Sequence, residues 1–66
     1  MEIIKDIKTV YRYKVIGLKE QREKAGLSLS QLANKLGISK SYVAKIETGE
    51  RFLPEKLHNK LVEAFN

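Results

Sequence analysis

The side chains able to do chemistry in this chain are mainly basic and hydroxyl groups, and many fall within residues 39–51. If residues 40–48 form a helix, positions i, i+1, i+4 and i+5 share one side of it. The residues at those positions are Lys40, Ser41, Ala44 and Lys45. Ammonium and hydroxyl groups donate hydrogen bonds, and the ammonium is also positively charged. The pattern favours binding of an anionic or hydrogen-bonding partner, with a solvated face of no function as the alternative.

The residues needed for most enzymatic or metal chemistry are missing from this inventory. The one histidine, His58, stands in an amphipathic stretch and is expected to be a solvated helix residue. There is no cysteine for a thiolate metal site or a disulfide, and the four glycines form no phosphate-binding loop. No Ser/His/Asp set can be assembled. We therefore expect a protein that is not an enzyme and uses no cofactor or metal.

Charge and composition narrow the class of protein further. Thirteen Lys and Arg residues against eight Asp and Glu residues give a net charge of +5, with a pI near 9.6. This balance meets the rough criterion for a nucleic-acid-binding domain, but many small basic domains bind nothing anionic. No apolar run approaches the ~20 residues of a membrane span, and the N-terminus lacks the apolar core of a signal peptide. These features predict one small cytoplasmic domain with no membrane partner.

Residues 17–66 are predicted to be an all-α domain, a small helical bundle. The apolar spacing and the capping residues place helices near 17–25, 29–36, 40–48 and 54–65. Ser28 and Gln31 have the spacing of a capping box, and Ser39 is positioned to cap the next helix. Gly37 is expected to end the helix before it with a positive φ angle. Pro54 suits the first turn of the last helix, because its missing N–H costs nothing there.

Residues 1–16 form an N-terminal extension with two conflicting patterns. Apolar residues recur at helical steps through Ile4, Ile7, Tyr11 and Val15, whereas Tyr11, Tyr13 and Val15 also alternate as they would in a strand. We interpret the segment as a helix that either pairs subunits, as an arm or dimerisation segment, or covers the core beside Leu18 and Phe65. The strand interpretation stays open.

The stretch LSQLANKLGISKSYVAKIET, residues 29–48, has the layout of two short helices joined by a tight turn. Seven positions have a packing reason in that layout: Leu32, Ala33, Leu36, Gly37, Ile38, Val43 and Ile46. With these residues in register, the chain resembles the Xre/Cro-type helix-turn-helix domains of phage and bacterial repressors, a lambda-repressor-like fold. The resemblance covers residues 26–51, and Arg22 and the last helix extend it to about residue 65.

The resemblance implies that the helix beginning at Lys40 enters the major groove of DNA while the helix beginning at Leu29 lies across the backbone. Its implied base-reading residues are Lys40, Ser41, Ala44 and Lys45. Its implied contacts to the DNA backbone are Ser28, Leu29, Ser39, Tyr42, Thr48 and Arg51. For Tyr42 the alternative is a ring packed flat on the domain, and for Arg51 it is an exposed loop arginine.

Structural roles are also implied by the resemblance. Arg22 and Glu47 match positions that form an ion pair between the first helix and the end of the third. Ala33 is small where the two helices cross, and Gly37 turns the chain between them.

The chain departs from the family's pattern in a few places. Leu29 and Thr48 stand where Gln and Asn commonly contact DNA, and Gln21 replaces an apolar residue. The usual fifth helix is also missing before Asn66, and residues 1–16 are a candidate replacement for it.

The function implied by the resemblance is a sequence-specific regulator of transcription that binds double-stranded DNA, most simply a repressor. It would act as a homodimer on a pseudo-palindrome whose half-sites lie about 34 Å apart. The alternative is an antitoxin that regulates its own gene through DNA and holds a toxin on another surface. Ile3, Ile4 and Ile7 could supply that surface. A third alternative is non-specific association with nucleic acid through net charge.

Overall fold

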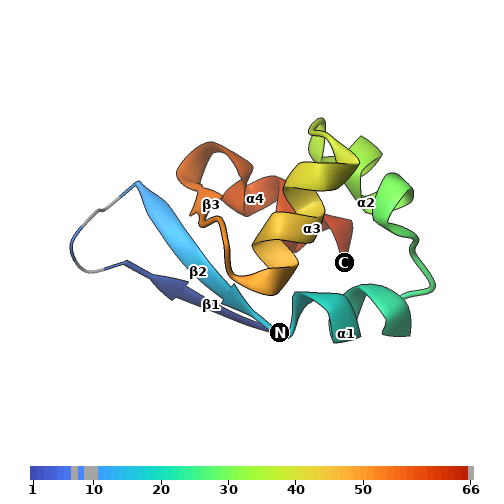
Figure 1. The fold of residues 1–66 in the computed structure, drawn as a ribbon, viewed down its shortest axis with the longest axis horizontal. Coiled ribbons are helices and arrows are strands. Elements are labelled where there is room, and N and C mark those ends of the chain that lie inside the picture. Colours follow the sequence, from blue (N-terminus) through green and yellow to red (C-terminus); the bar gives the residue numbers. More distant parts are fainter. Residues whose placement is uncertain (7, 9–10, 66) are drawn as a thin grey trace.

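A β-hairpin precedes four helices, and a third short strand lies just before the last helix (Figure 1). The computed structural model describes residues 1–6, 8 and 11–65. The elements are β1 (Glu2–Lys5), β2 (Arg12–Ile16), α1 (Leu18–Lys24), α2 (Leu29–Leu36), α3 (Lys40–Thr48), β3 (Leu53–Pro54) and α4 (Glu55–Ala64). None of the helices described is long and apolar enough to cross a membrane.

The expectation of a helix in residues 1–16 is wrong. The four predicted helices and the helix-turn-helix are present, but the fold is not purely all-α. β1 pairs antiparallel with β2, placing Ile3 opposite Val15, and β2 pairs antiparallel with β3, placing Tyr13 opposite Leu53. The result is a three-stranded sheet in the order β1-β2-β3 beside the helices. The alternating pattern prevails because it turns Ile3, Tyr13 and Val15 toward the core. Ile7, part of the predicted helical stripe, lies outside the described residues.

The last helix also begins differently from the prediction. Pro54 is the residue before α4, with extended backbone angles of φ −66° and ψ 150°, and it belongs to β3. The backbone N–H of Glu55 donates to the carbonyl oxygen of Tyr11 at 2.8 Å. The start of α4 is therefore fixed to the beginning of β2.

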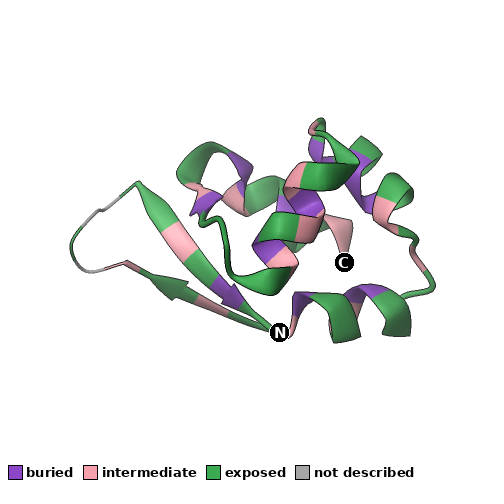
Figure 2. Ribbon diagram, viewed as in Figure 1, coloured by how far each residue is buried: buried purple, intermediate pink, exposed green. Residues whose placement is uncertain are grey.

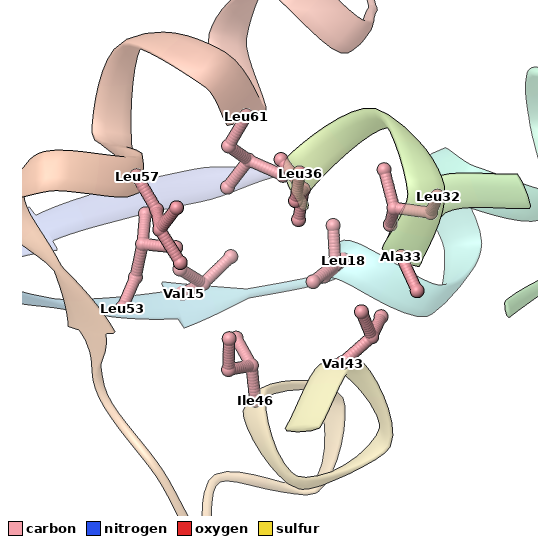
Figure 3. Close-up of a cluster of buried hydrophobic side chains, with 10 residues drawn as sticks. All are labelled: Val15, Leu18, Leu32, Ala33, Leu36, Val43, Ile46, Leu53, Leu57 and Leu61. Carbon is pink, nitrogen blue, oxygen red and sulfur yellow. The ribbon is translucent and has the colours of Figure 1, made fainter. Parts of the chain in front are cut away.

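The helices and the sheet share one hydrophobic core (Figures 2 and 3). It consists of Val15, Leu18, Leu32, Ala33, Leu36, Val43, Ile46, Leu53, Leu57 and Leu61, all buried. Ile3 and Tyr13 of the hairpin pack against this cluster, whereas Ile4 is exposed. The hairpin thus contributes to the same core as the helices.

The predicted helix ends around the turn between α2 and α3 are confirmed. The Gln31 backbone N–H donates to Ser28 Oγ at 3.1 Å, and the Ser28 N–H donates to Gln31 Oε1 at 2.8 Å, which completes the capping box. Ser39 Oγ accepts from the Tyr42 N–H at 3.1 Å. Gly37 ends α2 with φ +71°. Sequence signals at these caps therefore fix the angle at which α3 leaves α2.

Replacing Gly37 with valine is expected to destabilise the domain by about 1–3 kcal/mol, because a β-branched residue resists a positive φ. The Cβ atom itself has room, since at this position it would meet only Lys60 Nζ, at 3.8 Å. Gly37→Asn, which tolerates this conformation better, is the matched control and should lose less. Urea denaturation checks both variants. Equal stability of the valine variant and the original chain would contradict this account of the turn.

Candidate nucleic-acid interface

The two faces of α3 differ sharply in exposure (Figure 2). Val43 and Ile46 are buried in the core, whereas Lys40, Ser41 and Lys45 are exposed and Ala44 is half-buried. The predicted base-reading residues therefore lie on the side of α3 that faces away from the core. This is the side that a helix must present to enter the major groove.

Two shallow hollows run along the exposed side of α3. One, of about 140 Å³, is lined by Ser39, Ser41, Tyr42, Lys45 and Arg51. The other, of about 260 Å³, is lined by Ser41, Ala44, Lys45, Thr48 and Glu50. Apart from Lys40 and the two residues at the start of α2, all seven predicted DNA-facing residues line these hollows and so share one surface. Ser41 and Lys45 line both hollows.

Two of the hydroxyl groups predicted to contact the DNA backbone also cap helices. Ser28 Oγ and Ser39 Oγ each accept a backbone hydrogen bond, which leaves their own protons available to a phosphate. Thr48 differs, because its hydroxyl donates to the Lys45 carbonyl oxygen at 3.1 Å. Thr48 would have to give up that bond to donate to a DNA phosphate.

Leu29 and Tyr42 each have an apolar side packed against the core. The Leu29 side chain is apolar and half-buried, so only its backbone N–H can serve a phosphate at the start of α2. Tyr42 is also half-buried, yet it lines the hollow that contains Arg51. Packing on the domain and facing the DNA-side surface are therefore compatible for Tyr42.

The expected ion pair between Arg22 and Glu47 is present. Arg22 Nε donates to Glu47 Oε2 at 2.7 Å, Arg22 Nη2 lies 3.4 Å from Glu47 Oε1, and Arg22 Nη1 donates to the Leu27 carbonyl oxygen at 2.8 Å. Only 10% of the Arg22 side chain and 7% of the Glu47 side chain are exposed. The hydrogen bond that Arg22 donates to the Glu47 carboxylate raises the pKa of Arg22. The pair holds α1, the segment after it and the end of α3 together.

Ala33 and Gly37 occupy the crossing of α2 and α3. Ala33 is buried, and its carbonyl oxygen accepts from the Ile38 N–H at 3.1 Å just beyond the turn. A small residue here lets the two helices approach closely, as the sequence predicts.

Three residues beside the exposed side of α3 are not among those predicted from the sequence. Glu50 lines one of the α3 hollows, and Tyr11 and Arg12 of the hairpin line a third hollow next to it. Glu50 could have been found from its place just after Gly49. Tyr11 and Arg12 approach α3 only because β2 pairs with β3, which no local pattern indicates.

In the part of the chain that the structure describes, no three His, Cys, Asp or Glu side chains lie together as a metal site requires.

A short turn between two capped helices, the second presenting a polar and basic face, defines a helix-turn-helix domain. Residues 18–66 match the family described as Helix-turn-helix (HTH_3), which covers about three quarters of the chain. The chain belongs to this Xre/Cro-type helix-turn-helix family and contains its DNA-binding domain.

A relative of known name is similar over about three quarters of the chain. It is a Pyrobaculum aerophilum protein that carries the name of an HTH-type transcriptional regulatory protein, and it is 42% identical over 48 residues. Those residues are 73% of this chain and 19% of the relative, so the chain spans about a fifth of the length of that protein. No solved structure matches the chain.

Proposed function

We propose that this domain is a sequence-specific transcriptional repressor that reads duplex DNA with α3. The proposal rests on one observation: α3 is held firmly against the rest of the domain and still exposes one side to solvent. Its buried side and the Arg22–Glu47 pair hold it in place, while Lys40, Ser41 and Lys45 face outward. Lysine can donate to guanine O6 and N7, serine can serve either base, and the Ala44 methyl group suits thymine.

The backbone contacts in this proposal come from residues around α3. Ser39, Tyr42 and Arg51 border the same hollow as Lys45, so a phosphate strand beside the reading face would meet their donors. The N-terminal end of α2 would add the backbone N–H of Leu29 and the hydroxyl of Ser28 as that helix crosses the backbone, while the Ser28 N–H stays bonded to Gln31. Thr48 would contribute only after rearrangement.

We propose further that two copies bind one pseudo-palindromic site. A single reading helix contacts only a few base pairs, and a second copy about one helical turn away supplies the missing specificity. Binding that occludes a promoter then represses transcription.

Selection from random duplex DNA is the most direct test of the proposed function. We expect one enriched site with two inverted halves spaced by about one turn of DNA. A pool that never enriches, or equal affinity for the enriched site and a scrambled duplex, would contradict sequence-specific binding. An enriched site without internal symmetry would contradict the homodimer.

Affinity for the enriched site is expected to fall steeply with salt. The logarithm of the binding constant should decrease with the logarithm of salt concentration at a slope of about −0.9 for each phosphate contacted. Fluorescence anisotropy between ~50 and ~200 mM salt measures this slope. Affinity that does not change over that range would argue against phosphate contacts.

An antitoxin is the second candidate function, and the outer face of the hairpin favours it. Ile4 and Ile16 are diagonal neighbours on that face, and 45% and 44% of their respective surfaces are exposed. Ile3, in contrast, packs against the core, and Ile7 lies outside the described residues. Co-purification of a different chain that is released by charged substitutions at Ile4 and Ile16 would support this function over a stand-alone repressor.

A further inference from the structure

The β-hairpin projects from the helical part of the molecule on the side where β3 and the segment after α3 lie (Figure 1). Between them is a hollow of about 540 Å³, which we call the hairpin cleft. Tyr11 and Arg12 form its hairpin wall, and Tyr42, Glu50, Arg51 and Phe52 line the rest. The cleft is larger than either of the two hollows on the exposed side of α3.

The hairpin cleft is continuous with the exposed side of α3. Tyr42 and Arg51 line both the cleft and the hollow that contains Lys45, and Glu50 lines both the cleft and the other α3 hollow. If α3 lies in the major groove, the DNA strand at the edge of that groove would therefore pass beside the hairpin cleft. What flanks a helix in the major groove is the sugar–phosphate backbone.

The hairpin wall is held in a fixed position relative to α3. Arg12 pairs with Pro54 across the sheet, and its guanidinium carbon lies 4.1 Å from the centre of the Phe52 ring. The Tyr11 carbonyl oxygen accepts from the Glu55 N–H at 2.8 Å. These contacts join the start of β2 to the segment that follows α3, so no rearrangement is needed to present both walls at once.

The donors in the cleft suit phosphate oxygens. Seventy per cent of the Tyr11 surface and 46% of the Arg12 side chain are exposed, and arginine and tyrosine are common phosphate ligands. Arg12 Nε already donates to Asp6 Oδ2 at 2.8 Å, and Asp6 also accepts from the Lys8 backbone N–H at 2.9 Å. The carboxylates of Asp6 and Glu50 thus offset part of the positive charge of Arg12 and Arg51. They lower the affinity of the empty cleft for anions.

We propose that the β1–β2 hairpin is a second DNA-binding element. The hairpin cleft receives one sugar–phosphate strand beside the half-site read by α3, with Tyr11 and Arg12 on one wall and Tyr42 and Arg51 on the other. This inference rests on the proposed function, because it requires duplex DNA on α3. DNA contacts would then extend beyond the helix-turn-helix unit. Asp6 would weaken binding, because its carboxylate competes with phosphate for Arg12.

Opposite substitutions in one ion pair test this proposal. Arg12→Gln removes a phosphate contact and should weaken binding to the selected site about tenfold, with the salt slope less steep by about 0.9. Asp6→Asn removes the competing carboxylate and should tighten binding roughly two- to fivefold. If the pair served only to stabilise the hairpin, both variants would weaken binding or leave it unchanged.

A hydroxyl deletion, two charge controls and a stability measurement complete the test. Tyr11→Phe removes one exposed hydroxyl and should weaken binding to all site variants roughly two- to tenfold without changing base preference. Lys60→Gln and Glu63→Gln lie on a separate hollow between α2 and α4 and serve as the matched charge controls, with little expected effect. Thermal unfolding of each variant identifies losses that come from folding alone.

Hydroxyl-radical footprinting locates the contact directly. We expect the original chain to protect backbone positions beyond the selected base pairs, and we expect Arg12→Gln to lose that outer protection only. If the original chain selects no site, the proposed function fails. If it selects a site but the Arg12, Asp6 and Tyr11 variants keep its affinity and footprint, or if Arg12→Gln and Asp6→Asn change affinity in the same direction, only the hairpin inference is overturned.

Discussion

Glu47→Ala is expected to lower the free energy of unfolding by about 3–5 kcal/mol, a large share of the ~5–15 kcal/mol that stabilises a typical domain. The substitution leaves the Arg22 guanidinium buried without its carboxylate partner, and an unpaired buried charge is costly. Urea denaturation followed by circular dichroism measures the loss. We expect DNA affinity to fall together with stability, because Glu47 of α3 accepts a hydrogen bond from Arg22 of α1 and so fixes α3 to α1.

A double variant separates two free energies: the cost of leaving one buried charge unpaired, and the net contribution of the ion pair to stability. Arg22→Met together with Glu47→Leu removes both charges and should recover most of the stability lost in Glu47→Ala. Recovery should be incomplete, because the Leu27 carbonyl oxygen loses the hydrogen bond from Arg22 Nη1. An unfolding midpoint for Glu47→Ala that matches the original chain would show that the ion pair does not stabilise the domain.

The second large effect is expected from the reading face of α3. Lys45→Ala and Ser41→Ala should each cost roughly 1–3 kcal/mol of binding free energy at the selected site and relax base preference at one position of it. Affinity for a scrambled duplex should change far less. Binding of each variant to the selected site and to its single-base changes measures the preference directly.

Tyr42→Phe is the matched control for those variants, because Tyr42 lies on the same helix but borders the backbone side of the surface. It should weaken all sequences about equally. If the Lys40, Ser41 and Lys45 variants all kept the original base preference, α3 would not be the reading helix. Specificity would then have to come from DNA shape or from the hairpin.

Local sequence signals predicted α2, α3 and the turn between them to the residue, and the physical reason is that the caps are local. Ser28, Gln31, Gly37 and Ser39 each act within a few residues of their own position. The Arg22–Glu47 pair is not local, and it was expected only because the chain resembles a family that has it.

The extension was predicted wrongly because its decisive contacts lie far away in the chain. Within residues 1–16 a helical stripe and a strand-like alternation coexist, and neither excludes the other. The strand interpretation prevails through Leu53, which pairs with Tyr13 and completes the buried side of the sheet. The same long-range pairing explains why Tyr11 and Arg12 were not predicted as site residues.

The pairing of β2 with β3 also has a kinetic consequence, since it joins Tyr13 to Leu53 across about forty residues of chain. Closing so long a loop costs conformational entropy before any strand contact can offset that cost. The α2–α3 turn joins residues that are close in sequence, so its closure costs much less. We expect this strand pair to form after the folding transition state, so weakening it should accelerate unfolding and leave the folding rate nearly unchanged. The contact that fixes the hairpin beside α3 would then set the lifetime of the folded domain and not the speed of its formation.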